Sequence, residues 1–167
     1  MIKTKYLKTI ATSALLFGCF IFFGFKPVSG PSSIYKCMIQ LTNYSGEGAY
    51  IVISLINPEG NYEKTLYVLG DDDEWYFDIT EWWKFHGKVR TNIDAITGET
   101  ISGGERSISI IEIENDKIDK GYRLRFETAV EDQEYYTDDV EFDLSSENVK
   151  GKFEGRGFIR YVRMLPQ

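Results

Sequence analysis

The sequence has few of the residues that metal and thiol chemistry require. Its 167 residues include two cysteines and a single histidine, His86. One histidine excludes a histidine-rich metal site, and a Ser-His-Asp triad would have to use this residue. No nucleophile and base are evident as a pair in the chain. We therefore expect a protein that is not a stand-alone enzyme.

Cysteine is also too scarce for a disulfide framework. Cys19 lies in an apolar N-terminal run, so only Cys37 belongs to the rest of the chain. One cysteine forms no intrachain disulfide, and stability must come from the core. Tyr35, Cys37, Ile39 and Leu41 recur at every second position. This alternation predicts a strand in which Cys37 is a buried core thiol.

Basic charge is scarce beyond the N-terminus. The chain has 19 basic and 26 acidic residues, and residues 1–30 contain four lysines and no acid. Residues 31–167 therefore carry 15 basic and 26 acidic residues, a net charge of −11. No basic stripe of the kind that phosphate backbones require is present, so we expect no nucleic-acid partner.

Residues 1–30 have the layout of a targeting segment. Three early lysines precede an apolar run over residues 10–25, which is typical of a secretory signal and shorter than a comfortable membrane span. Leu16-Phe17-Gly18-Cys19 is similar to a lipoprotein box. Cleavage, lipidation at Cys19 and retention as a membrane anchor stay open. We expect an exported protein, in the periplasm or on the outer face of the cytoplasmic membrane.

Residues 31–167 read as a single all-β domain of sufficient size to bury a core. Several segments alternate apolar and polar residues or are continuously apolar, and turn signals separate them. These expected strands cover residues 35–42, 49–57, 64–70, 107–114, 122–131, 135–144 and 157–164. Their number and spacing predict an antiparallel, two-sheet β-sandwich of immunoglobulin-like type, with a closed small barrel as the alternative.

One short helix, over about residues 78–86, interrupts the strands. Asp78 and Glu81 have the spacing of a capping box, and His86 near the helix end suits the helix dipole. Trp82 and Trp83 give the helix a broad apolar face. This face either covers the core or offers aromatic rings for a ligand.

An acidic run, Asp71-Asp72-Asp73-Glu74, precedes this helix. Its spacing differs from that of an EF-hand, and a solvated connection explains it, although a weak calcium site stays open.

A compact polar loop follows the helix, with the sequence Asp94-Ala95-Ile96-Thr97-Gly98-Glu99-Thr100. Two hydroxyls and a flexible glycine could approach a ligand closely, and successive N–H groups in such a loop can bind an anion. The loop resembles the Asp-x-x-(Ser/Thr)-Gly-Ala-(Thr/Ser) motif of exported bacterial electron-transfer proteins, with Glu99 in the place of alanine. In those proteins a flavin transferase attaches FMN to the final hydroxyl.

That resemblance implies a role for each matching residue. Asp94, Thr97 and Gly98 would be recognition residues, and Thr100 would accept covalent FMN. Trp82 and Trp83 would be available to stack on the isoalloxazine ring.

From about residue 34 to the C-terminus the chain also resembles a bacterial family of predicted periplasmic proteins, domain of unknown function 2271. The resemblance rests on the Leu66-Tyr67-Val68-Leu69-Gly70 strand, the Trp82-Trp83 helix and the Asp94 to Thr100 loop, in that order. It implies a membrane redox protein, of iron or flavin chemistry, as a partner. Two hypotheses follow: an exported redox accessory protein with FMN on Thr100, or a cofactor-free β-sandwich binding or scaffold module that partners a membrane protein.

Overall fold

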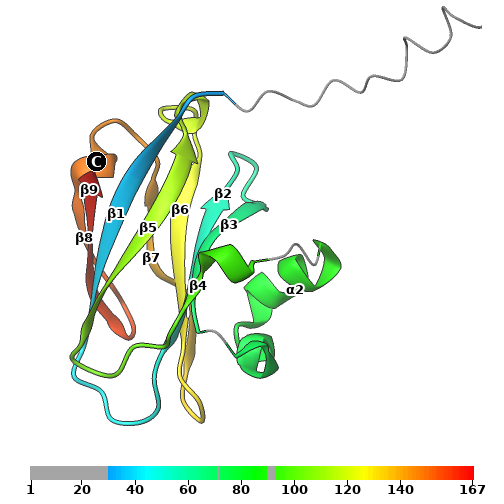
Figure 1. The fold of residues 1–167 in the computed structure, drawn as a ribbon, viewed down its shortest axis with the longest axis vertical. Coiled ribbons are helices and arrows are strands. Elements are labelled where there is room, and N and C mark those ends of the chain that lie inside the picture. The colour runs from blue at the N-terminus through cyan, green and yellow to red at the C-terminus, as the bar shows by residue number, and fades with distance from the viewer. Residues whose placement is uncertain (1–29, 71, 90–92) are drawn as a thin grey trace, which may run out of the picture.

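The computed structural model describes residues 30–70, 72–89 and 93–167. Within them the chain forms nine strands, one α-helix and four 3-10 turns (Figure 1). In chain order these are β1 (Ser32–Leu41), β2 (Tyr50–Ile56), β3 (Tyr62–Leu69), η2 (Asp73–Asp78), α2 (Thr80–Val89), η3 (Asp94–Ile96), β4 (Thr97–Gly98), β5 (Arg106–Glu114), η4 (Asn115–Lys117), β6 (Arg123–Ala129), β7 (Tyr135–Asp143), η5 (Asn148–Lys150), β8 (Lys152–Glu154) and β9 (Ile159–Pro166).

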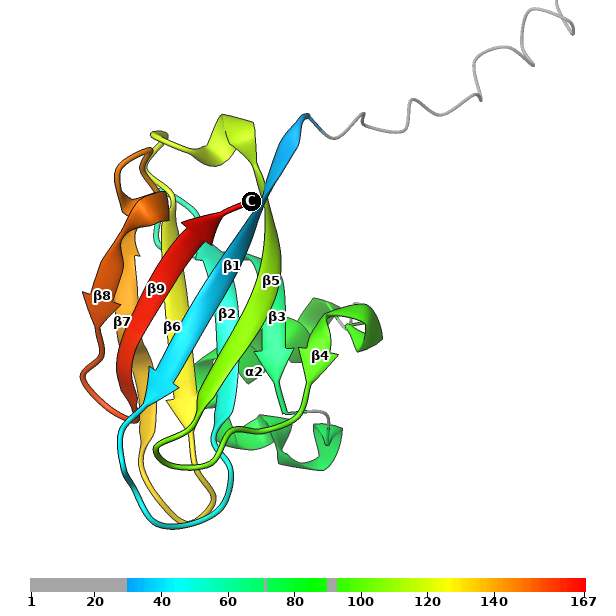
Figure 2. The same ribbon diagram turned by 60° about the vertical axis from the view of Figure 1, so that its left-hand side comes forward.

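The strands form two sheets that pack face to face. One has the order β5-β1-β9-β8 and the other β4-β3-β2-β6-β7, and Figure 2 shows the four-stranded sheet lying across the five-stranded one. The predicted all-β sandwich is confirmed, and the alternative of a closed barrel is excluded. All pairs are antiparallel except β3 with β4, which is parallel, a departure from the fully antiparallel prediction.

Alternating side chains of both sheets build the core between them. In β1 the inward residues Tyr35, Cys37, Ile39 and Leu41 are all buried, as their spacing predicted. The Cys37 thiol contacts the Met164 sulfur at 3.3 Å. Burial raises the pKa of this thiol to about 12, which keeps it protonated and unreactive.

A second, smaller core lies on the other side of the five-stranded sheet, where η2 and α2 cover it (Figure 1). This layer explains why residues Ile51 to Ile56 of β2 are all buried. A strand covered on both faces reads as a continuous apolar run, and one covered on a single face alternates. Trp82 is the largest side chain of this second core and is fully buried.

The helix begins later than predicted. Asp78 ends η2, and α2 starts at Thr80. The expected capping box is replaced by other contacts, because the Glu81 carboxylate pairs with Lys84 and the Glu81 N–H donates to the Tyr135 hydroxyl at 3.2 Å. The residues before the helix form a 3-10 turn instead, which Asp72 caps by accepting the Glu74 N–H at 3.0 Å.

Two short strands, β4 and β8, were not predicted. Each has too few residues to show an alternating pattern. In the described ranges, no helix has the length and apolar character needed to cross a membrane.

Candidate functional site

The loop that contains the FMN-type motif is held to its neighbours on both sides of Thr100. Before it, β4 pairs with the end of β3, and the Gly70 N–H donates to the Gly98 carbonyl at 2.6 Å. After it, Ala49 and Ile101 exchange backbone hydrogen bonds of 2.7 and 3.2 Å. The hydroxyl that the motif identifies as an acceptor therefore lies on a fixed backbone.

Thr100 itself is exposed. It lies against Gly48, where an added methyl group would overlap the Thr100 hydroxyl. Gly98, earlier in the loop, lies against the Tyr67 hydroxyl, which a methyl group at Gly98 would approach to 2.9 Å. Small residues at these two positions allow the loop to pack closely on β3 and on the start of β2.

A cleft of about 170 Å³ opens beside Thr100. Two aromatic rings line it, those of Tyr50 and Trp75. The rest of its lining is made by Glu47, Gly48, Asp78, Thr100, Ala129 and Glu131. An adjoining hollow of about 360 Å³ shares Trp75, Asp78 and Glu131 and adds Phe77, Asp132 and Tyr135 among others. We call the two together the acidic cleft, since carboxylates and aromatic rings line it without a lysine or arginine.

The tryptophan pair lies elsewhere. Trp82 is fully buried, donates its indole N–H to the Thr65 hydroxyl at 2.8 Å, and stacks on His86 with ring centroids 4.7 Å apart. It presents no ring face to solvent for a flavin. Trp83 is half-buried, with its ring 6.4 Å from that of Tyr76.

The predicted site residues are thus only partly brought together. Thr97, Gly98 and Thr100 share one pinned loop, and Asp94 starts η3 directly before it. The rings beside Thr100 are Tyr50 and Trp75, which sequence reasoning missed. The aromatic run Trp75-Tyr76-Phe77 after the acidic residues was the available signal. Trp82 reaches the cleft only indirectly, since Tyr76 packs on Trp82 at 5.2 Å and on Tyr50 at 6.3 Å.

A buried carboxyl, Glu127, lies under α2 on the covered face of β6. It is fully buried and accepts hydrogen bonds from the Tyr62 hydroxyl at 2.7 Å and from the Tyr135 hydroxyl. Burial raises the pKa of Glu127 to about 7, and the two hydroxyls, Arg125 and the Trp82 N–H oppose the shift. Nothing in the sequence distinguished this residue from Arg123 and Arg125, which are only partly buried at alternate positions of the same strand.

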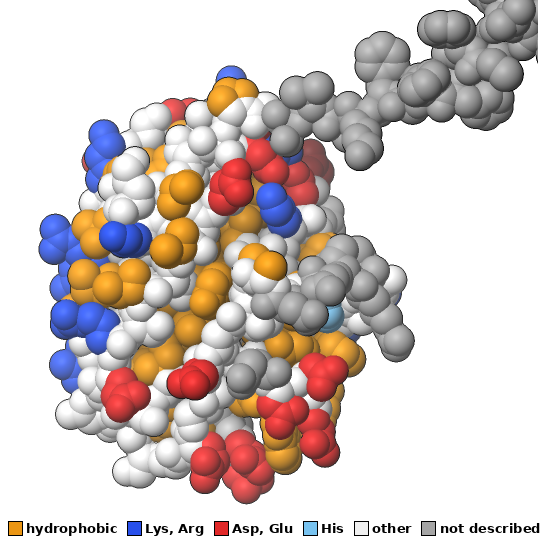
Figure 3. All heavy atoms as spheres, viewed as in Figure 1, with side chains coloured by type: hydrophobic (Ala, Val, Ile, Leu, Met, Phe, Trp, Pro, Cys, Tyr) orange, Lys and Arg blue, Asp and Glu red, His pale blue; other side chains and the backbone are white. Residues whose placement is uncertain are grey.

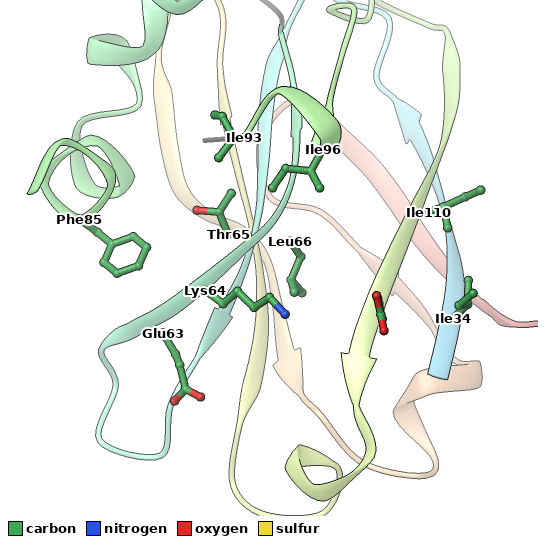
Figure 4. A pocket seen from close by; sticks show the side chains of 10 residues that line it. Ile34, Glu63, Lys64, Thr65, Leu66, Phe85, Ile93, Ile96 and Ile110 are labelled. Atoms are coloured by element: carbon green, nitrogen blue, oxygen red, sulfur yellow. The ribbon is translucent and has the colours of Figure 1, made fainter. Parts of the chain in front are cut away.

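A groove of about 490 Å³ lies between β3 and β5 (Figure 4). Ile93, directly before η3, and Ile96, at its end, line one side of the groove together with Leu66 of β3. Ile34 and Ile110 border it on the side of the four-stranded sheet. Lys64 spans its edge and pairs with Glu114 at 3.1 Å. The groove is mainly apolar and distinct from the acidic cleft.

Metal binding finds no support in the described residues, which contain no group of three or more histidine, cysteine or carboxylate side chains suited to hold an ion. Of the acidic run considered for calcium, Asp72 caps η2 and Asp71 lies outside the described residues.

The fold and the loop define a small two-sheet β-sandwich domain, a scaffold on which functional residues commonly lie in loops. This chain belongs to the DUF2271 family of predicted periplasmic proteins, whose model matches residues 32–161. The membership confirms the resemblance noted from the sequence and identifies an exported protein. No curated protein matches the chain. No solved structure matches it either.

Proposed function

We propose that this domain is an exported accessory protein of a membrane redox system and that it carries FMN on Thr100 through a phosphoester. One observation carries the proposal: Thr100 is an exposed residue on a loop held by backbone hydrogen bonds, and it lines a cleft together with Tyr50 and Trp75. A flavin transferase would attach FMN there, with Asp94, Thr97 and Gly98 as its recognition residues.

The surroundings of Thr100 fit an attached flavin. Thr100 lines the cleft together with two aromatic rings, which could stack on an isoalloxazine ring, and this ring would supply the electron-transfer chemistry. The phosphate would lie near Glu99, which is also exposed. Two unit charges 4 Å apart in water interact by only about 1 kcal/mol, so this carboxylate lowers the stability of the attached state little.

A second candidate is a cofactor-free binding module, and the composition of the acidic cleft favours it. Glu47, Asp78 and Glu131 line the cleft beside Thr100 together with two aromatic rings, and no basic side chain balances them. Carboxylates and aromatic faces are the groups that attract an organic cation or a lysine or arginine side chain. The partner would then present a basic segment to this cleft.

The deciding experiment is coexpression of the full chain with a flavin transferase and export in a bacterial host. We expect a mass increase of FMN less water and flavin absorbance, both lost in Thr100→Ala. Ser102→Ala is the matched control, because Ser102 is an exposed hydroxyl in the same loop. An unmodified mass, while a positive-control protein is labelled, would overturn the flavin proposal.

The full chain expressed without the transferase tests the second candidate. Titration of the unmodified protein with a short lysine- and arginine-containing peptide should quench the fluorescence of Trp75, which lines the cleft. Asp78→Asn together with Glu131→Gln should weaken that binding, and raised salt should do the same. Quenching that is unaffected by both changes would contradict a cation site.

A further inference from the structure

Large exposed apolar side chains are concentrated on one face of the domain. Four are exposed among the described residues, and three of them, Ile34, Ile108 and Ile110, point outward from the four-stranded sheet. In the strand register Met38 lies beside Ile108. Lys36 pairs with Ile110 on one side and with Leu165 on the other, so these residues lie in one row. We call the outward side of β5, β1, β9 and β8 the outer face.

Basic side chains are interleaved with these apolar ones. Lys36 lies between Ile110 and Leu165, and Arg163 lies beside Met38. Lys152 is paired with Arg163 across β8 and β9, and Arg106 begins β5. The cations therefore form a band across all four strands.

These four cations lack carboxylate partners, whereas Lys64, Lys84, Lys117, Arg123, Arg125 and Arg156 each form an ion pair. Within the described part of the chain, Lys36, Arg106, Lys152 and Arg163 form no ion pair. Arg106 instead donates to Gln40 and Tyr161, and Lys152 lies over the Tyr161 ring. In a domain with 26 acidic residues, unpaired cations on one face leave that face positive.

The outward rows carry three carboxylates, Glu112 and Glu114 on β5 and Glu154 on β8, against the four cations, and Glu114 is paired with Lys64. The formal charge of the face is therefore +1, whereas residues 31–167 as a whole carry −11. Figure 3 shows the separation: lysine and arginine side chains gather along the β8 and β9 side with apolar patches between them, and most visible carboxylates lie toward the opposite side and the lower end.

We propose that the outer face docks on a membrane surface that contains anionic lipid. Such a surface presents negative headgroups to the cations and an apolar interior into which isoleucine side chains partition. Lysine and arginine can extend toward the phosphates while their stems cover apolar surface. The acidic remainder of the domain is repelled by the same headgroups, which sets the orientation.

The position of the face in the chain agrees with this occupant. Ile34 follows the apolar targeting run, which ends at Phe25, by nine residues. Nine extended residues span at most about 30 Å, so a retained or lipidated N-terminus keeps the face within reach of the bilayer. The groove between β3 and β5 opens directly beside Ile34 and Ile110 (Figure 4) and extends the apolar area. The proposal does not depend on FMN at Thr100.

The test places an environment-sensitive dye on the outer face of the full chain. Cys37 is buried and its thiol is protonated, so Cys19→Ser with Ile108→Cys leaves one reactive site. Phe77→Cys, at the fourth exposed apolar residue and on the acidic cleft, is the matched control position. Both labelled proteins are mixed with vesicles of phosphatidylcholine alone and with vesicles that also contain phosphatidylglycerol.

We expect a blue shift of the dye at position 108 with phosphatidylglycerol vesicles only, and none at position 77. Lys36→Gln with Arg163→Gln should lower the ratio of docked to undocked domain about fivefold for each cation removed, and high salt should reverse the shift. An equal shift on neutral vesicles, an equal shift at position 77, or no shift at all would overturn the proposal. So would a shift without vesicles that grows with protein concentration, which would identify a second copy of the chain as the occupant.

Discussion

Asp139 shows how much of the sandwich can depend on a single polar side chain. It is buried in the middle of β7 and accepts hydrogen bonds from the backbone N–H groups of Arg156, Gly157 and Ile159 at 2.8 to 2.9 Å and from the Thr128 hydroxyl at 2.6 Å. These bonds fix the turn that leads into β9. Its neighbour in sequence, Asp138, is exposed and pairs with Arg156 at the surface.

This contrast gives a stability prediction. Asp139→Ala leaves several buried donors without a partner, each at about 1 to 3 kcal/mol, so we expect a loss of at least about 3 kcal/mol in the free energy of unfolding. Asp138→Ala removes an exposed ion pair and should cost less than about 1 kcal/mol. Urea titration of both variants measures the difference, and equal losses would contradict this account of Asp139.

Glu127 predicts a component of stability that depends on pH. Its carboxyl has an ordinary pKa of 4.5 and a pKa of about 7 in the folded domain. Between these values the folded domain holds a proton that the unfolded chain has released, so stability falls as pH rises through this window. The loss amounts to at most about 3 kcal/mol. Below the window both states hold the proton, and above it neither does.

Glu127→Gln should remove this component. The free energy of unfolding of the variant, relative to the wild type, should increase from pH 4.5 to 7 and then level off. Glu131→Gln is the control, because Glu131 is exposed. A constant difference between Glu127→Gln and wild type across this range would show that the buried carboxyl does not titrate there.

At the scale of elements, α2 and η2 form a layer of their own on the five-stranded sheet, and Trp82 is its central side chain. Trp82→Ala removes a fully buried ring and its bond to Thr65, so we expect a loss of about 3 to 5 kcal/mol. Trp83 is only half-buried, and Trp83→Ala should cost clearly less. Denaturant unfolding of both variants tests this order, and a larger loss for Trp83→Ala would reverse the assignment.

The loop element of Thr100 predicts an effect of Gly48. A methyl group at this position overlaps the Thr100 hydroxyl, so Gly48→Ala should displace the acceptor and reduce FMN attachment at least tenfold, a barrier change of about 1.4 kcal/mol. Gly30→Ala is the control, because nothing lies within 4 Å of the added group. Attachment yield is read from intact mass, and equal yields would show that the position of Thr100 is not critical.

The sequence was informative about elements and much less about the site. Alternation in β1 predicted its place in the sandwich because one face of the four-stranded sheet is exposed, whereas the layer of η2 and α2 that covers Glu127 on β6 was not foreseen. The helix start was wrong because a 3-10 turn occupied Asp78, and local spacing does not decide between these turns. The acidic cleft could not be predicted, since it joins Gly48, Trp75, Thr100 and Glu131, which are far apart in the chain.

At the scale of the whole molecule, the outer face and the acidic cleft lie on different sheets and differ in charge. The outer face belongs to the four-stranded sheet, whereas the acidic cleft is formed by η2, the Thr100 loop and the start of β2, associated with the five-stranded sheet. A domain that docks by the first keeps the second open to solvent. A redox or protein partner of the cleft would then approach from the aqueous side.

The place of β1 in its sheet has a consequence for biogenesis. β1 lies between β5 and β9, so the first strand of the domain pairs with the last one, as Tyr35 does with Pro166. An exported chain that leaves the cytoplasm N-terminus first delivers β1 long before either neighbour. The four-stranded sheet stays incomplete until β9 has crossed the membrane. Pairing of the first strand with the last one delays folding until the whole chain has crossed, which suits passage through the membrane as an unfolded chain.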